Sequence, residues 1–357
     1  MPLLRLKESY NPHPLRWWHW PLLILLIAGT IYCALEYNGL HTDEQEENAP
    51  FQHNAGTVFG TIYHLTYQHP QDLQQEVDSL LEALDLDLSP FNENSNIRAI
   101  NDGRTMLMTS RLQQVVELAL QVSQTTNGAF DITVAPLVNA WGFGWETADQ
   151  LPSTATLDSL RRLVGYQQLT LHADTLIKAN PRLTIDCAAI AKGFAVDEVA
   201  DFLEHHGADN YMVEIGGEIR LHGHNPSGEP WHIGVNQPND SLEGMAAVLN
   251  LQQAAIATSG NYRNFYVKEG RKVAHTIDPR TGMPVSHSLL SATVLAPSCA
   301  EADAYATAFM VLGLDSTQRL LQQQPRLQAF LIYADSLGQL ATWATDSLAN
   351  AMEREAE

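Results

Sequence analysis

Short segments that alternate apolar and polar residues, rich in β-branched and aromatic side chains, recur along most of this chain. Such segments are typical of half-buried strands. Only a few segments with apolar residues at helical spacing separate them, and runs of strands broken by few helices predict an α+β fold with mostly antiparallel sheets and flanking helices. The expected strands are 57–67, 169–177, 211–223, 231–236, 246–251, 265–268, 290–295, 329–333 and 340–342, and the main expected helices are 73–86, 112–122, 190–205, 301–312 and 316–323.

An apolar run at residues 17–36 precedes this pattern. It is long enough to cross the hydrocarbon core of a bilayer, and tryptophans at its start favour the membrane interface. Basic residues precede the run and acidic residues follow it, so the positive-inside rule predicts a cytoplasmic segment 1–16 and one transmembrane helix over 17–36. We expect a linker at 37–54, an exported domain at 55–345 and a tail at 346–357. A cleaved signal peptide is the alternative.

The chain is strongly acidic, with a formal net charge of -21. Such a surface repels nucleic-acid phosphates, so we expect no nucleic-acid partner. An acidic protein that binds an anionic nucleotide needs a local cation. The cysteines show neither paired metal spacing nor a disulfide framework, and we expect Cys187 and Cys299 to be small buried apolar side chains.

The segment from Asp186 to Asp197 has the composition of a phosphate-binding turn. Small residues follow the carboxylate of Asp186, and Lys192 and a glycine then open an expected helix. A helix start offers free N–H groups, and a lysine adds a point charge for a phosphate oxygen. An ordinary helix start with a solvated lysine is the alternative. A Gly-Gly pair at 216–217 marks either a turn or a close backbone approach.

Two further segments carry groups suited to catalysis. His275 lies three residues before Asp278 at the start of an Asp-Pro-Arg-Thr-Gly turn, where a histidine could take a proton from an attacking hydroxyl. A structural turn with a hydrogen-bonded histidine is the alternative. Asp303 and Thr307 share one face of an expected helix and are hard oxygen donors of the kind that Mg²⁺ prefers. A surface pair on an amphipathic helix is the alternative there.

Taken together and in this order, these segments resemble the ApbE family of FAD:protein FMN transferases. The resemblance extends from about residue 57 to about residue 313, nearly all of the expected exported part. It is carried by Phe59-Gly-Thr61, Leu88-Ser-Pro-Phe91, Asn94-Ser-Asn-Ile97, Gly128-Ala-Phe-Asp131, Asp186 to Asp197, Gly216-Gly217, Ala257-Thr-Ser-Gly-Asn-Tyr262, His275 to Gly282, and Ala302-Asp303 to Thr307.

The resemblance implies a two-lobed fold that binds FAD in a cleft between the lobes. Mg²⁺ would be held by the Ala189 carbonyl, Asp303 and Thr307. The family usually has tyrosine where this chain has Phe91, and some members have an aspartate where it has Ala306. The residues implied to contact FAD are Phe91, Ala129, Phe130, Asp131, Asp186, Lys192 and Ile277.

The implied reaction transfers FMN from FAD to a threonine or serine hydroxyl of a target flavoprotein and releases AMP. His275 is the candidate base, and Asp278 would orient it or share its role. The partner would be an exported or membrane-bound electron-transfer protein, and the enzyme a single-pass protein of a bacterial inner membrane with its catalytic domain on the periplasmic side. An Mg²⁺-dependent FAD pyrophosphatase and a non-catalytic FAD-binding module are the alternatives.

Overall fold

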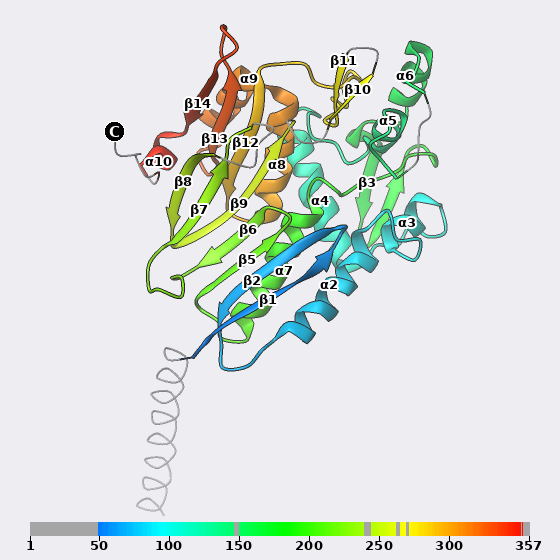
Figure 1. Cartoon of the computed structure of the whole chain (residues 1–357). Helices are drawn as coiled ribbons and strands as arrows, with labels where there is room; N and C mark the ends of the chain where they lie inside the picture. The colour runs from blue at the N-terminus through cyan, green and yellow to red at the C-terminus, as the bar shows by residue number, and fades with distance from the viewer. Residues whose placement is uncertain are drawn as a thin grey trace, which may run out of the picture. The chain divides into compact units, whose positions relative to one another are not determined.

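The computed structural model describes residues 49–145, 150–238, 244–261, 265–268, 271–350 and 352. In this part of the chain, eight strands form one sheet in which every neighbouring pair is antiparallel (Figure 1). The antiparallel α+β architecture is thus confirmed. The strands, in their order across the sheet, are β1 (Phe51–Val58), β2 (Thr61–Gln68), β5 (Tyr211–Ile215), β6 (Glu218–His222), β9 (Gln253–Gly260), β12 (Leu289–Ala296), β13 (Gln328–Ala334) and β14 (Leu340–Ala344).

Helices α7 and α8 pack against this sheet and against each other, and they position the candidate site. Nearly every residue of α8 is buried, since the helix contacts β9, β12, α4 and α7. A helix enclosed in this way is mostly apolar, and its alanines allow close approach from several sides. The helices are α2 (Gln74–Leu88), α3 (Asn96–Asn101), α4 (Ser110–Thr125), α5 (Ala135–Ala140), α6 (Thr154–Arg161), α7 (Ala191–His205), α8 (Cys299–Leu312), α9 (Leu314–Gln323) and α10 (Asp346–Ala349), with a 3₁₀ turn at Tyr166–Gln168.

Both faces of the large sheet carry an apolar core. Along β13, Ala329 and Leu331 join the core that includes α7 and α8, whereas Phe330 and Ile332 join a second core with Trp231. This alternation follows from the two-residue period of a strand. The second core is closed by the hairpin of β7 (Trp231–Asn236) and β8 (Met245–Leu251).

A smaller group of elements lies at one side of the sheet and includes α5, α6 and β3 (Figure 1). Its own apolar cluster contains Leu137, Trp141, Leu157 and Ile277, and the Trp141 indole donates a hydrogen bond to the Gly282 carbonyl at 2.9 Å. From Phe51 onward the chain forms one compact unit, so this group is not a separate domain. It also contains the hairpins of β3 (Leu169–His172) with β4 (Thr175–Lys178) and of β10 (Phe265–Lys268) with β11 (Arg271–Ala274).

Several expected strands are hairpins. The strand expected at 57–67 turns at Phe59 and Gly60, which both have positive φ, as a two-residue hairpin turn requires. The strand expected at 169–177 turns near Ala173, and the one at 211–223 turns at Gly216-Gly217. These segments were expected as single strands because the residues on both sides of each turn are types that favour strands, although the buried positions change from even to odd residue numbers across Phe59-Gly60.

The domain boundaries also differ from those expected. Strand β1 begins at Phe51, inside the expected linker 37–54, and α10 lies in the expected tail 346–357. The expected anchor 17–36 lies outside the described residues. Among the residues that are described, no helix combines the length and apolarity needed to cross a membrane.

Candidate active site

A cavity of about 960 Å³ lies where α7, α8, the sheet and the smaller group of elements meet. Its volume is typical of sites that hold a large cofactor or nucleotide. Every residue predicted to act at the site lines this cavity except Asp278, although the lining extends along the chain from Phe91 to Val311. The predicted residues in the lining are Phe91, Ala129, Phe130, Asp131, Asp186, Ala189, Lys192, His275, Ile277, Asp303 and Thr307.

The first turn of α7 is attached directly to α8. The Gly193 N–H donates a hydrogen bond to Asp303 Oδ2 at 3.1 Å. A Cβ atom at Gly193 would lie 2.3 Å from the Cys299 carbonyl oxygen, so only glycine allows the two helices to approach this closely. The glycine of the Lys-Gly pair is therefore required for packing.

Asp197 makes a second connection between the same two helices. Its carboxylate accepts hydrogen bonds from the N–H groups of Cys299 and Ala300 at 2.9 and 2.8 Å, and Arg220 lies 3.5 Å from it. Free N–H groups at a helix start favour an acidic partner. Burial raises the pKa of Asp197 to about 6, against the lowering effect of these two donors. The start of α8, and with it Asp303, is held in a fixed position relative to α7.

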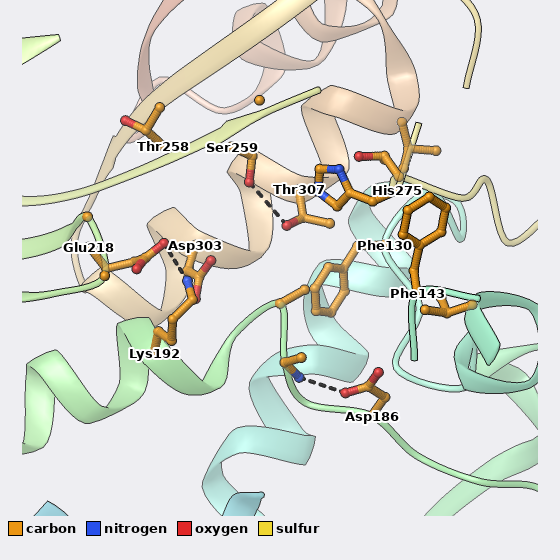
Figure 2. Close-up of a pocket in the computed structure, with 18 of the residues that line it drawn as sticks. Phe130, Phe143, Asp186, Lys192, Glu218, Thr258, Ser259, His275, Asp303 and Thr307 are labelled. Atoms are coloured by element: carbon orange, nitrogen blue, oxygen red, sulfur yellow. Dashed lines mark hydrogen bonds and ion pairs between the residues drawn. The ribbon is translucent and has the colours of Figure 1, made fainter. Parts of the chain in front are cut away.

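A buried ion cluster occupies one end of the cavity (Figure 2). The Lys192 ammonium lies 2.5 Å from Glu218 Oε1 and 4.0 Å from Asp303 Oδ2. Burial raises the pKa of Glu218 to about 8 and also raises the pKa of Asp303, and in both cases Lys192 opposes the effect. Burial lowers the pKa of Lys192, but the two carboxylates outweigh this and raise it overall. With both carboxylates ionised, two negative charges share a single ammonium.

This end of the cavity fits a divalent cation. Asp303, Thr307 and Ala189 all line the cavity, and the Thr307 hydroxyl lies 3.3 Å from that of Ser259. Glu218 Oε2 is buried and makes no hydrogen bond with any described residue. The described residues contain no cluster of three or more His, Cys, Asp or Glu suited to a metal. A carboxylate, a hydroxyl and a carbonyl match the sparse donor set of Mg²⁺, which keeps phosphate oxygens and waters as its other ligands.

Aromatic side chains gather at another part of the cavity. His275 and Phe143 form an edge-to-face pair with ring centroids 6.3 Å apart, and Figure 2 shows both across the cavity from Lys192. Phe91 is 67% exposed and makes an edge-to-face contact with Trp145 at 6.4 Å. Exposed aromatic faces beside a cavity suit a planar ring system.

Comparison with known proteins decides the family. The sequence profile described as "ApbE family" matches residues 59–331. The chain belongs to the ApbE family. It is 40% identical over 278 residues to the FAD:protein FMN transferase of Vibrio cholerae serotype O1, spanning 75% of this chain and 83% of the relative. It is 35% identical over 282 residues to the FAD:protein FMN transferase of Escherichia coli K12, spanning 75% and 80%.

Solved structures of ApbE proteins have the same fold. The flavin transferase ApbE from Vibrio cholerae superposes with a TM-score of 0.78 at 36% identity, covering 85% of this chain and 99% of that one. The apo form of the Pseudomonas stutzeri flavinyl transferase ApbE gives a TM-score of 0.76 at 32% identity, covering 85% and 96%. This chain therefore has the ApbE fold.

Asp278, the predicted partner of His275 in this ApbE-family chain, has hydrogen-bond partners within its own turn. Both carboxylate oxygens accept hydrogen bonds from the Arg280 side chain at 2.9 Å, and Asp278 does not line the cavity. Its backbone N–H donates to the Met283 carbonyl, and its carbonyl accepts from the Gly282 N–H. The described contacts of Asp278 shape the turn, and its role in orienting His275 stays a prediction.

Two other predicted FAD contacts of the ApbE-family site have internal partners. The Asp131 carboxylate accepts hydrogen bonds from the Thr133 N–H and hydroxyl through one oxygen and from the Tyr166 N–H through the other. It therefore anchors the loop that lines the cavity. Asp186 accepts a hydrogen bond from the Ala188 N–H at 2.9 Å, and burial raises its pKa.

Sequence reasoning missed several lining residues of this ApbE-family cavity. Glu218 follows the Gly216-Gly217 pair, and nothing in its local pattern indicates that it contacts Lys192. Phe143 and Trp145 lie in the segment Trp141-Gly-Phe-Gly-Trp145. Aromatic residues alternating with glycines are a signal that could have indicated a binding loop.

Proposed function

We propose that this chain is an Mg²⁺-dependent FAD:protein FMN transferase that moves FMN from FAD to a threonine or serine hydroxyl of an acceptor protein and releases AMP. The observation that carries the proposal is one cavity, about 960 Å³ in volume, that combines the cation donor set of Asp303 and Thr307 with His275 and an aromatic wall. The relatives named FAD:protein FMN transferase support the same reaction.

The residues of the cavity have separate tasks in this proposal. Asp303, Thr307 and the Ala189 carbonyl would hold the cation, a hard ion that also prefers phosphate oxygens and waters as ligands. Bound Mg²⁺ supplies Lewis-acid neutralisation of the charge that builds on the phosphates. The exposed ring of Phe91 offers a stacking face for the flavin.

The transfer itself balances without a further reactant. The acceptor oxygen forms a bond to the phosphorus of the FMN half, and the bond from that phosphorus to the bridging oxygen breaks. AMP leaves with the bridging oxygen. His275 receives the hydroxyl proton on a ring nitrogen, which lets the oxygen attack as its negative charge develops.

Intact-mass measurement of the acceptor tests this function. The full-length protein in detergent is incubated with FAD, Mg²⁺ and a flavoprotein domain that presents an accessible threonine, and the acceptor should gain the mass of one FMN group. Free FMN and AMP without an adduct would instead indicate an FAD pyrophosphatase. Intact FAD after prolonged incubation would indicate a binding module without catalysis.

We also propose that residues 17–36 anchor the enzyme in a bacterial inner membrane and that its catalytic domain is periplasmic. The apolar run and the charges on either side of it support this proposal. Such an anchor would keep the enzyme near exported or membrane-bound electron-transfer proteins. Protease added to intact spheroplasts should digest the catalytic domain, and a variant that lacks residues 1–36 should leave the membrane fraction. A protected domain would contradict the orientation.

A further inference from the structure

We infer that Glu218 is a positioning residue that holds the Lys192 ammonium away from Asp303 and thereby keeps Asp303 available to a cation. The inference deepens the proposed function and depends on it, because it concerns the same candidate metal site. It assigns a task to a buried carboxylate that neither the sequence motifs nor the proposed reaction uses.

The distances within the cluster show that Lys192 contacts Glu218 more closely than Asp303. Lys192 Nζ lies 2.5 Å from Glu218 Oε1, which is hydrogen-bonding distance, but 4.0 Å from Asp303 Oδ2, which is not. Asp303 Oδ2 instead accepts its hydrogen bond from the Gly193 N–H. A neutral amide donor satisfies one lone pair and leaves the charge of the carboxylate available to a cation.

The fold keeps Glu218 in this position. It is the first residue of β6, pairs with Ile215 across the hairpin, and is only 3% exposed. A Cβ atom at Gly216 would lie 2.9 Å from the Thr61 side chain and 3.4 Å from Lys192 Cδ, so the glycine turn also leaves room for the lysine stem. The ammonium is therefore directed to Glu218 by the shape of the turn.

The second oxygen of Glu218 shows that the residue is not simply a satisfied part of the core. Glu218 Oε2 is buried, lies in a residue that lines the cavity, and accepts no hydrogen bond from a described residue. A buried carboxylate oxygen without a hydrogen bond destabilises the folded protein, so other interactions of the same carboxylate must offset this loss. The ion pair between Glu218 and Lys192 is the interaction that offsets it.

Removal of Glu218 would redirect the lysine. An ammonium left without its nearest partner in a buried cluster would move toward the remaining carboxylate, Asp303, because an unpaired buried charge is unfavourable. A lysine bound to Asp303 would then compete with Mg²⁺ for the same oxygens. The effect of a Glu218 substitution on cation binding should therefore depend on the presence of Lys192.

A double-mutant cycle tests this dependence. All variants carry His275→Ala, so that bound FAD turns over slowly, and the full-length protein is titrated with Mg²⁺ while the quenching of FAD fluorescence is followed. In the presence of Lys192, Glu218→Gln should raise the half-saturating Mg²⁺ concentration about tenfold, the size expected for one lost charged hydrogen bond. In the Lys192→Met background the same substitution should have no such effect.

Glu214→Gln is the matched control. Glu214 also lines the cavity but contacts His64 and the Gly217 N–H instead of Lys192, so its substitution removes a nearby negative charge and should leave the Mg²⁺ requirement unchanged. Lys192→Met alone should lower the half-saturating Mg²⁺ concentration, because the competing ammonium is gone. This measurement does not require that a Glu218 variant folds.

Four results would overturn the inference. An unchanged Mg²⁺ requirement in Glu218→Gln, or an equal increase with and without Lys192, would show that Glu218 does not act through the lysine. A higher Mg²⁺ requirement in Lys192→Met would show that the ammonium does not compete with the cation. If FAD binding by the parent protein does not depend on Mg²⁺ at all, the metal assignment in the proposed function fails as well, which separates the two cases.

Discussion

The Gly193 N–H donates a hydrogen bond to Asp303 Oδ2 across 3.1 Å, so the first turn of α7 and the candidate metal-binding helix α8 are held together at the carboxylate itself. Lys192 precedes this glycine, and Asp197, one turn further along α7, accepts from the N–H groups of Cys299 and Ala300. One short stretch of α7 therefore fixes the place of the charged groups at the site.

Gly193→Ala should destabilise the protein, although the same change in an ordinary helix would stabilise it. The new Cβ would lie 2.3 Å from the Cys299 carbonyl oxygen, and backbone cannot move aside easily. We expect a loss of about 1–3 kcal/mol in the free energy of unfolding, measured by denaturant titration. Gly234→Ala is the control, because its Cβ would meet only the end of the flexible Met245 side chain. Equal effects of the two substitutions would contradict the close-packing argument.

Asp197→Ala should also destabilise the protein, because it leaves two buried N–H groups at the start of α8 without an acceptor. The expected loss is about 2–4 kcal/mol in the free energy of unfolding. Asp201→Ala removes another carboxylate that pairs with the same Arg220, but this one is half exposed, and the expected loss is under about 1 kcal/mol. Thermal unfolding of both variants compares them directly, and similar melting temperatures would argue against the capping role.

Cys187 and Cys299 should resist thiol-alkylating reagents in the folded protein. Both side chains are fully buried, and burial raises the pKa of each thiol well above its usual value, so the reactive thiolate is scarce. Peptide mass mapping after a short treatment with iodoacetamide should find both unmodified in the native protein and both modified after denaturation. Rapid native labelling of either one would show that the core around α8 opens readily.

His275→Ala should lower the rate of FMN transfer by about 10²–10⁴-fold if this side chain is the general base. Asp278→Ala should have a much smaller effect on the rate, because the Asp278 carboxylate is paired with Arg280 and lies outside the cavity lining. Single-turnover measurements at saturating FAD separate chemistry from binding. A transfer rate near that of the unsubstituted protein in His275→Ala would remove the histidine from the mechanism.

Asp303→Ala should abolish Mg²⁺-dependent turnover of FAD, since it removes the one carboxylate in the proposed donor set. Chelation of the cation should have the same effect on the unsubstituted protein and should be reversed by added Mg²⁺. Glu301→Ala on the same helix is the control, because Glu301 pairs with Arg326 and does not line the cavity. Full Mg²⁺ dependence in Asp303→Ala would refute the ligand assignment.

Local patterns were sufficient to find α7 and α8. The expected helices 190–205 and 301–312 differ from Ala191–His205 and Cys299–Leu312 by one or two residues, because helical periodicity and capping residues act within a few positions. The motifs likewise indicated many of the residues that line the cavity. In contrast, the hairpin at Phe59-Gly60 was missed, because residues that favour strands lie on both sides of the turn and only a one-residue shift in the buried positions marks it.

The sequence by itself determined the fold class, the family and most of the residues that meet at the cavity, since these depend on spacing, residue type and local conformation. Only the tertiary structure decided which charged groups pair. In the folded chain, Lys192 pairs with Glu218 and Asp278 pairs with Arg280. Asp197 accepts a hydrogen bond at the start of α8. The reason is that each carboxylate has several possible partners, and burial and distance, which no local pattern specifies, select one of them.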